Sequence, residues 1–188
     1  MANFIREALN MIRRLVLFIT IIAMFIVSGC GGGSSAPKKE STKVLGINGV
    51  NYLAYNSSDV DIAITNLRTA ETIGTNPYLK KKALGKFILV DVFINNNQKD
   101  AITVDSNSFK ILDSQKREYS QSVEGETALQ MEKGDTKGFL TKLNPGMGTT
   151  FTFVYDVPGN LDINAANLEA RGGFVGSKIV IPLKVQKK

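Results

Sequence analysis

Residues 87–94 read FILVDVFI, an apolar run that only Asp91 interrupts. A short, nearly continuous run of this kind, rich in β-branched and aromatic residues, predicts a central strand covered on both faces. The polar residues from Asn95 to Asp100 follow the run and predict a turn. We therefore expect the fold to be built around one buried strand.

Other short apolar segments lie on both sides of this strand, with turn residues between them. Val60 to Leu67 alternates between apolar and polar residues and predicts a strand, and Phe151, Phe153 and Tyr155 fall on one face of another. Residues 109–112 and 117–119 predict a hairpin around the turn at 113–116. Further extended segments are expected at residues 101–105, 149–156, 168–171 and 178–185.

The number and spacing of these segments indicate the fold class. Seven or eight short strands without a long helical pattern predict an all-β, antiparallel two-sheet sandwich. Pro182 cannot donate a ladder hydrogen bond, so the last strand is expected at an edge or with a bulge. Residues 123–134, which include Glu126 and Leu129, predict a turn or two of helix between strands.

The N-terminal residues 1–29 have the pattern of an export signal. Arg13 and Arg14 precede the apolar stretch 15–27, and Ser28 and Gly29 are small residues directly before Cys30, the only cysteine. An uncleaved membrane anchor is the alternative, although the uncharged run is near the lower limit of about 20 residues for a span. Met11 is an alternative start of the chain.

The stretch from Ile26 to Cys30 resembles the processing motif of bacterial lipoproteins. The resemblance implies a signal helix, cleavage between Gly29 and Cys30, and a diacylglyceryl group, with chains such as palmitate, on the thiol of Cys30. Residues 30–42, rich in Gly, Ser and Lys, then predict a flexible tether, and residues 43–188 predict the folded domain. We expect the protein to be extracytoplasmic and held by lipid on the outer face of the cell membrane.

The composition excludes several function classes. The chain has no histidine and a single cysteine, so it cannot assemble a Ser-His-Asp or Cys-His nucleophile or an imidazole-based metal site. The formal net charge is +6, and the leader, with three arginines and one glutamate, accounts for +2 of it, which leaves +4. Charges of both signs are mixed, which is untypical of nucleic-acid binders. We predict a protein that is not an enzyme and has no cofactor.

Two groups of acidic side chains have a spacing that suggests a site. Asp59 and Asp61, like Asp105, Asn107 and Asp113, could supply oxygen ligands to calcium, but capping of turns explains them better, and no metal site is predicted. Two further acids, Glu124 and Glu126, superficially resemble a pair of catalytic carboxylates. We expect them to lie in an exposed loop instead.

Lys80, Lys81, Lys82 and Lys86 form the densest basic cluster, next to Pro77 and Tyr78. Such a cluster could contact lipid headgroups, wall polymers or an acidic partner. A solvated loop that protects a strand edge is the favoured alternative.

Six segments together resemble a telokin-like domain of unknown function that is found in many bacterial lipoproteins. The resemblance spans roughly residues 42–185, and it implies an immunoglobulin-like sandwich similar to a secreted mycobacterial antigen but no particular activity. The segments that carry it are 85–96 (GKFILVDVFINN), 102–105 (ITVD), 109–113 (FKILD), 117–119 (REY), 143–146 (LNPG) and 153–158 (FVYDVP).

These features together predict a lipid-anchored binding module of the bacterial cell envelope. Its expected partners are the membrane, through the lipid on Cys30, and another envelope protein or a wall polymer, but no nucleic acid. One alternative is a lipoprotein that captures a small ligand or ion for a transporter. Another is a phage-type superinfection-exclusion lipoprotein, a role that the family resemblance brings with it.

Overall fold

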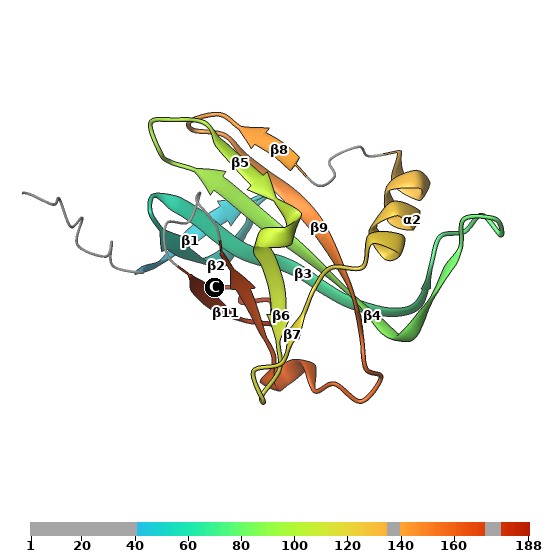
Figure 1. Cartoon of the computed structure of the whole chain (residues 1–188). Helices are drawn as coiled ribbons and strands as arrows, with labels where there is room; N and C mark the ends of the chain where they lie inside the picture. Colours follow the sequence, from blue (N-terminus) through green and yellow to red (C-terminus); the bar gives the residue numbers. More distant parts are fainter. Residues whose placement is uncertain (1–40, 135–139, 172–177) are drawn as a thin grey trace, which may run out of the picture. The chain divides into compact units, whose positions relative to one another are not determined.

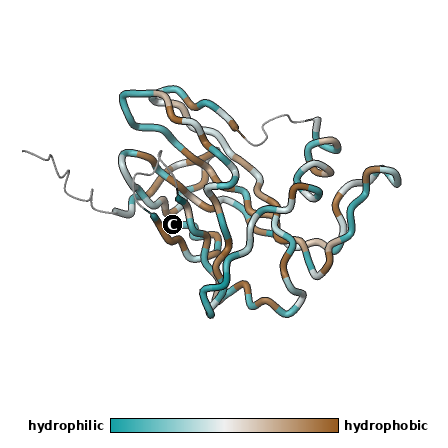
Figure 2. Tube along the Cα trace, viewed as in Figure 1, coloured by the Kyte–Doolittle hydropathy of each residue, from teal (hydrophilic) through white to brown (hydrophobic). Residues whose placement is uncertain are grey.

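The computed structural model describes residues 41–134, 140–171 and 178–188, and most of this chain is antiparallel strand (Figure 1). Hydrophobic and hydrophilic residues alternate along many of the strands (Figure 2). The strands are β1 (Ser41–Ile47), β2 (Val50–Ser57), β3 (Val60–Ile73), β4 (Lys81–Asn96), β5 (Ile102–Asp105), β6 (Phe109–Leu112), β7 (Glu118–Tyr119), β8 (Leu140–Leu143), β9 (Gly148–Val157), β10 (Asn167–Ala170) and β11 (Ile179–Pro182). A helix, α2 (Val123–Lys133), and two short 3-10 turns, η1 (Ser106–Ser108) and η2 (Ile163–Ala165), complete the described elements.

Strand β4 is the centre of the larger sheet, as the apolar run predicts. The sheet has the order β1-β2-β3-β4-β9, and every neighbouring pair in it is antiparallel. Ile88, Val90 and Val92 face the main core, whereas Phe87 and Leu89 face a second cluster on the other side. Both faces of this part of β4 are therefore covered.

The main core lies between this sheet and two smaller groups of strands. One is a four-stranded sheet with the order β11-β10-β6-β7, and the other is the pair β5-β8. Phe151, Phe153 and Tyr155 all lie in this core, and Phe153 stacks on Phe109 with ring centroids 4.5 Å apart. The predicted antiparallel sandwich is confirmed, and Pro182 lies in the edge strand β11.

Helix α2 covers the second cluster on the outer side of the larger sheet. The Ser122 hydroxyl accepts a hydrogen bond from the Gly125 amide (3.2 Å) at the start of the helix, and Gly134, with φ of 64°, ends it. Ala128 and Leu129 pack with Phe87 and other apolar residues of this cluster. The helix has 11 residues and is therefore longer than the predicted turn or two.

Several boundaries differ from the prediction. Strand β1 begins at Ser41, two residues inside the predicted tether, and pairs with β2 through a two-residue turn at Asn48 and Gly49. Both turn residues have positive φ (49° and 79°), which is the conformation that favours an Asn-Gly hairpin. The prediction of seven or eight strands was too low because this hairpin and strand β8 were overlooked. The predicted leader and residues 30–40 lie outside the described residues.

Candidate functional site

The β3–β4 hairpin extends beyond the core and exposes apolar side chains at its turn. The Asn76 carbonyl accepts hydrogen bonds from the amides of Leu79 (3.0 Å) and Lys80 (2.8 Å), and its side-chain oxygen accepts one from the Tyr78 amide (2.9 Å). These bonds shape a turn in which the Tyr78 side chain is 93% exposed. Local turn chemistry therefore places an aromatic ring in solvent.

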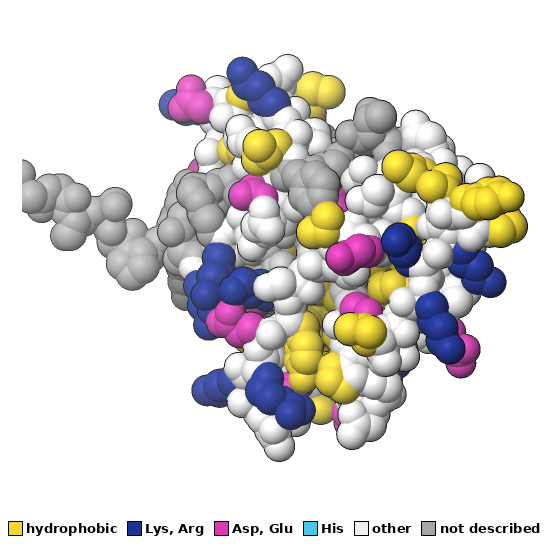
Figure 3. Space-filling model, turned by 45° about the vertical axis from the view of Figure 1, so that its right-hand side comes forward, with side chains coloured by type: hydrophobic (Ala, Val, Ile, Leu, Met, Phe, Trp, Pro, Cys, Tyr) yellow, Lys and Arg dark blue, Asp and Glu magenta, His cyan; other side chains and the backbone are white. Residues whose placement is uncertain are grey.

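An apolar groove runs between this turn and helix α2, and we call it the α2–hairpin groove. Its volume is about 290 Å³, and hollows of about 200 Å³ and 230 Å³ continue along the hairpin. Figure 3 shows hydrophobic side chains gathered on part of this side of the molecule, with Lys and Arg side chains beside them. The groove is lined by Tyr78, Leu79, Lys81, Val123, Glu124, Thr127, Ala128 and Met131.

The predicted basic cluster is divided among different surroundings. Lys80, Lys81 and Lys82 are exposed at the hairpin turn, and Lys81 lines the α2–hairpin groove. Lys86 is half-buried instead, because its Nζ donates a hydrogen bond to the Leu161 carbonyl (2.9 Å). The first three lysines can act as a contact surface, and Lys86 has a structural partner.

A bulge separates Lys86 from the other three lysines. Residues 83–86 of β4 lie opposite Glu71 alone in β3, so the hairpin extension continues after a break in the regular pairing. The Leu84 and Gly85 amides in this bulge donate to the Asp156 carboxylate at 2.8 Å and 3.2 Å. A Cβ on Gly85 would lie 2.2 Å from the Val157 carbonyl oxygen, so the close approach of β9 requires glycine here.

Glu126 is not in an exposed loop, and that prediction was wrong. It lies in α2, where its side chain is 3% exposed, while Glu124 is exposed beside the groove. Two residues along a helix correspond to about 200° around its axis, so the two carboxyl groups cannot face one substrate. Sequence adjacency was misleading because the helix separates the two side chains.

The environment of Glu126 changes its titration. Burial raises the pKa of this carboxyl, although a hydrogen bond from the Gln130 side chain to Oε1 (3.2 Å) lowers it in part. Among the described residues, Oε2 has no hydrogen-bond partner, and the adjoining cavity has a volume of only about 40 Å³. That volume suits a water molecule better than a substrate.

The aspartates considered as calcium ligands bind protein groups. Asp105 accepts from the Asn107 amide (2.9 Å), and Asp113 accepts from the Gln115 and Arg117 amides (both 2.9 Å), so capping of turns is confirmed at both positions. In the described part of the chain, no three acidic or cysteine side chains gather in a way that could hold a metal ion.

Asp61 is the centre of a buried polar cluster that the sequence did not reveal. The Asn56 and Asn97 side chains each donate to its carboxylate at 2.6 Å, and Lys43 forms an ion pair with it at 2.7 Å. Burial alone would raise the pKa of Asp61, but Lys43 and the surrounding asparagine amides outweigh it and lower the pKa. These residues come from β1, β2, β3 and the loop after β4, so the cluster holds the sheet together at this end.

Comparison with protein families assigns the domain. Residues 54–179 match the family described as domain of unknown function (DUF4352). The chain belongs to this family. The predicted resemblance to a domain of unknown function is thereby confirmed. No curated protein matches this DUF4352 chain.

The DUF4352 chain is similar to several solved structures at low sequence identity. A conserved hypothetical protein from Bacillus anthracis has a TM-score of 0.50 and 14% identity, over 81% of this chain and 99% of that chain. The secreted protein MPT63 from Mycobacterium tuberculosis has a TM-score of 0.43 and 15% identity, over 82% and 100% of the two chains. An uncharacterized β-sandwich protein from Clostridium difficile has a TM-score of 0.41 and 20% identity, over 79% and 100%.

The structure does not describe the predicted processing site. Gly29 and Cys30, the predicted cleavage and lipidation positions, lie outside the described residues. No helix in the described part of the DUF4352 chain has the length and apolar character needed to cross a membrane.

The α2–hairpin groove was missed from the sequence, although an Asn-Pro turn followed by Tyr and Leu next to lysines was a visible sign of an exposed apolar turn.

Proposed function

We propose that this protein is a lipid-anchored binding module on the outer face of the cell membrane, and that it binds an apolar segment of another envelope protein in the α2–hairpin groove. One observation carries the proposal. Exposed apolar side chains gather around this groove, among them Val123 (55% exposed) and Met131 (57%). Contiguous apolar surface of this kind is typical of interaction sites.

The charges at the groove agree with a protein ligand. Its floor includes Leu79 and Ala128, while Lys81 and Glu124 contribute opposite charges to its lining. An apolar side chain of the partner would fill the floor, and polar groups around it would pair with the two charges. This arrangement follows the usual anatomy of an interface, with an apolar centre and a polar rim.

The groove is poorly suited to the alternatives. Its volume of about 290 Å³ is at the lower limit of small-molecule pockets, which are about 300–1,000 Å³, so capture of a solute is less favoured. Lys81 and Glu124 are exposed, so solvent rather than a buried site surrounds the charged groups that a catalytic mechanism would need. Binding without catalysis is the function that this geometry supports best.

The anchor belongs to the same proposal. Ten residues lie between Cys30 and Ser41, the first residue of β1, and an extended chain with these eleven residue-to-residue steps spans at most about 40 Å. A lipid on Cys30 would therefore keep the module close to the membrane, where envelope proteins are its available partners.

Site-specific photo-crosslinking in intact cells tests the groove. A photoreactive amino acid at Met131 should give one or a few discrete adducts with an envelope protein, and adding Ala128→Glu in the groove floor should abolish them. The control places the same photoreactive residue at Ser114, which is exposed in the turn between β6 and β7. Equal adduct patterns at Met131 and Ser114, or no adduct at Met131, would contradict binding in the groove.

A further inference from the structure

The hairpin extension has a second exposed side that faces away from the groove. Lys81 lines the groove, and Ala83 packs with Ile73 in the cluster under α2. Because neighbouring side chains point to opposite sides of a strand, Lys82 faces away from Lys81 and the groove. Leu84 lies in the bulge that follows, where residues 83–86 are opposite Glu71. Leu84 is 100% exposed. We call Tyr78, Lys80, Lys82 and Leu84 the tip face. Tyr78, at the turn, belongs to the tip face and also lines the α2–hairpin groove.

The tip face combines apolar groups with positive charge. Tyr78 and Leu84 expose 93% and 100% of their surface, and exposed lysines lie between them in the chain. Tyrosine is enriched where proteins meet the headgroup region of a bilayer, and lysine near an anionic leaflet is attracted to it. The combination fits a lipid surface better than it fits bulk water.

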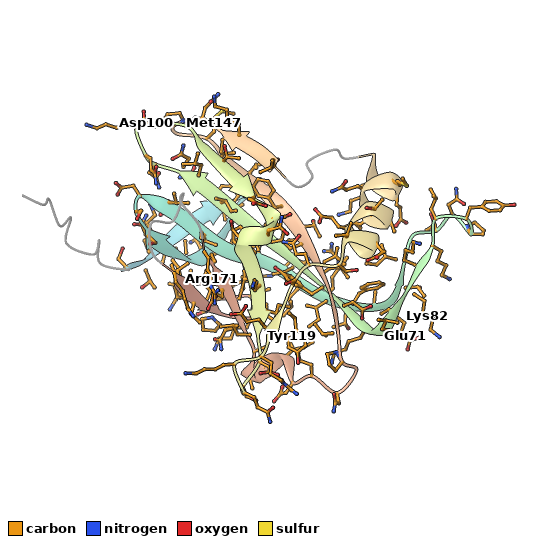
Figure 4. The ribbon with its side chains drawn as sticks, viewed as in Figure 1. Glu71, Lys82, Asp100, Tyr119, Met147 and Arg171 are labelled. Atoms are coloured by element: carbon orange, nitrogen blue, oxygen red, sulfur yellow. The ribbon has the colours of Figure 1, made fainter. Side chains whose placement is uncertain are left out.

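The nearby acidic groups reduce this charge without cancelling it. Glu71 is one residue before Thr72, the cross-strand partner of Lys82, and both labelled side chains lie on the hairpin extension (Figure 4). The Asp156 carboxylate accepts hydrogen bonds from two backbone amides, and these donors partly offset its negative charge. With Lys81 included, three consecutive lysines stand against these two carboxylates. Glu124 and Glu132 of α2 line the groove and the hollows beside it, and they add negative charge on the groove side.

We infer that the tip face docks onto the anionic lipid surface of the membrane that holds the chain. Tyr78 and Leu84 enter the headgroup region, and Lys80 and Lys82 contact the anionic headgroups. The docking rests on the proposed anchor at Cys30 and goes beyond the proposed function, because it fixes the orientation of the module. Tyr78 borders the α2–hairpin groove as well, and the part of the groove lined by Lys81 and by α2 stays open to a protein partner.

The length of the tether limits how the docked domain can be oriented on the membrane. Ser41 pairs with Asn56 near the start of β3, and β3 then runs 14 residues toward the tip, which is about 48 Å at 3.4 Å per residue. The tether reaches about 40 Å at most. The domain must therefore lean toward the bilayer for the lipid and the tip to engage together.

Fluorescence on reconstituted vesicles tests the docking. The mature protein is inserted through its own lipid into phosphatidylcholine vesicles with or without phosphatidylglycerol, and Leu84→Cys carries a polarity-sensitive dye. Because a thioether blocks the sulfur of Cys30, the thiol introduced at position 84 is the only free one for the dye. A blue shift and quenching by spin-labelled lipid are expected only with phosphatidylglycerol, and Ser114→Cys should show neither.

Charge variants distinguish docking through the tip face from a general attraction of the positively charged domain to anionic lipid. Lys82→Glu in the labelled protein should lower the docked fraction at least about fivefold, since one lysine near an anionic surface corresponds to roughly that factor. Lys81→Glu on the groove side is the matched control and should have a smaller effect. Salt at 1 M, where the screening length is about 3 Å, should abolish the signal at position 84.

The outcomes that overturn the docking are distinct from failure of the proposed function. A dye at position 84 that reports water on both kinds of vesicle overturns it, as does a protein adduct from a photo-crosslinker at position 84 in cells without a lipid signal. Mass spectrometry of the purified mature chain reports separately whether Cys30 carries lipid. Adducts at Met131 report separately on the groove.

Discussion

Asp61 shows how one buried side chain can organise the end of a sheet. Its carboxylate receives hydrogen bonds from Asn56, Asn95 and Asn97 and an ion pair from Lys43. A buried charge is tolerated when its oxygens are satisfied in this way. The sequence placed Asp61 near a strand start but gave no sign of three asparagines converging on it, because they come from two separate segments, β2 and the end of β4 with the loop that follows.

We expect Asp61→Asn to destabilise the protein by about 2–3 kcal/mol, because the amides would lose a charged acceptor. The measurement is the free energy of unfolding in denaturant at pH 7. Asp100→Asn is the control, since Asp100 is exposed in the loop after β4 (Figure 4) and should change stability by less than about 0.5 kcal/mol. Equal effects of the two substitutions would contradict the role of Asp61.

Acid should destabilise the fold through Asp61 and Asp91. Burial alone would raise the pKa of Asp91, but Arg68, Thr152 and Asn66 lower it overall, as the surrounding groups do for Asp61. Each folded pKa lies below the ordinary 3.8, so the unfolded chain binds protons first as the pH falls. The free energy of unfolding should therefore decrease below about pH 4. A stability that is flat between pH 5 and pH 2 would contradict this expectation.

Glu126 should make the stability depend on pH in the opposite direction. Burial raises its pKa, so its contribution to stability is present below the unfolded value of 4.5 and is lost as the pH rises through the folded pKa. Glu126→Gln removes this loss and should stabilise the protein at pH 7 by about 1 kcal/mol, the low end of the cost of an unsatisfied buried group. The comparison is thermal unfolding of both proteins at pH 4 and pH 7. A substitution with the same effect at both pH values would exclude titration of Glu126.

At the scale of the element, helix α2 depends on a close approach to the sheet. A Cβ on Gly125 would lie 2.8 Å from Cγ1 of Val154 and 3.0 Å from Cε1 of Phe87. Alanine favours a helix by about 1 kcal/mol over glycine, but here the helix would have to move away from β4 and β9. Helix propensity therefore favours alanine at this position, whereas tertiary packing favours glycine.

We expect Gly125→Ala to destabilise the protein by about 1–3 kcal/mol despite the higher propensity. Glu124→Ala, exposed in the same helical turn, is the control and should be close to neutral. Thermal unfolding followed by circular dichroism measures both. A more stable Gly125→Ala variant would show that α2 does not pack this tightly.

The elements also show where the sequence pattern was sufficient. The run at residues 87–94 predicted a central strand, since a strand covered on both faces must be apolar at nearly every position. The β1–β2 hairpin was missed although Asn48-Gly49 is a strong hairpin turn, because β1 is mostly exposed and lacks an apolar pattern. The length of α2 was underestimated because the buried side of the helix is short and includes the polar Glu126 among its apolar residues.

At the scale of the whole molecule, the anchor is the feature to test first. Cys30→Ala should move the protein from the membrane fraction to the medium or leave it unprocessed, because no thiol remains to carry the lipid. Fractionation with detection of the domain measures this, and Ser34→Ala in the predicted tether is the control. A mature form that stays in the membrane fraction without Cys30 would contradict the lipid anchor.

The sequence by itself determined the sandwich, its central strand and the family, because strand periodicity and turn residues are local and repeat along the chain. It also predicted the anchor position, which depends on a contiguous motif. Only the tertiary structure decided which side chains meet. The burial of Glu126, the convergence on Asp61, and the groove between Tyr78 and Met131 all depend on how separate segments pack. Such contacts have no contiguous pattern, because separate segments form them: Asn97 is 36 positions from Asp61, and Met131 is 53 positions from Tyr78.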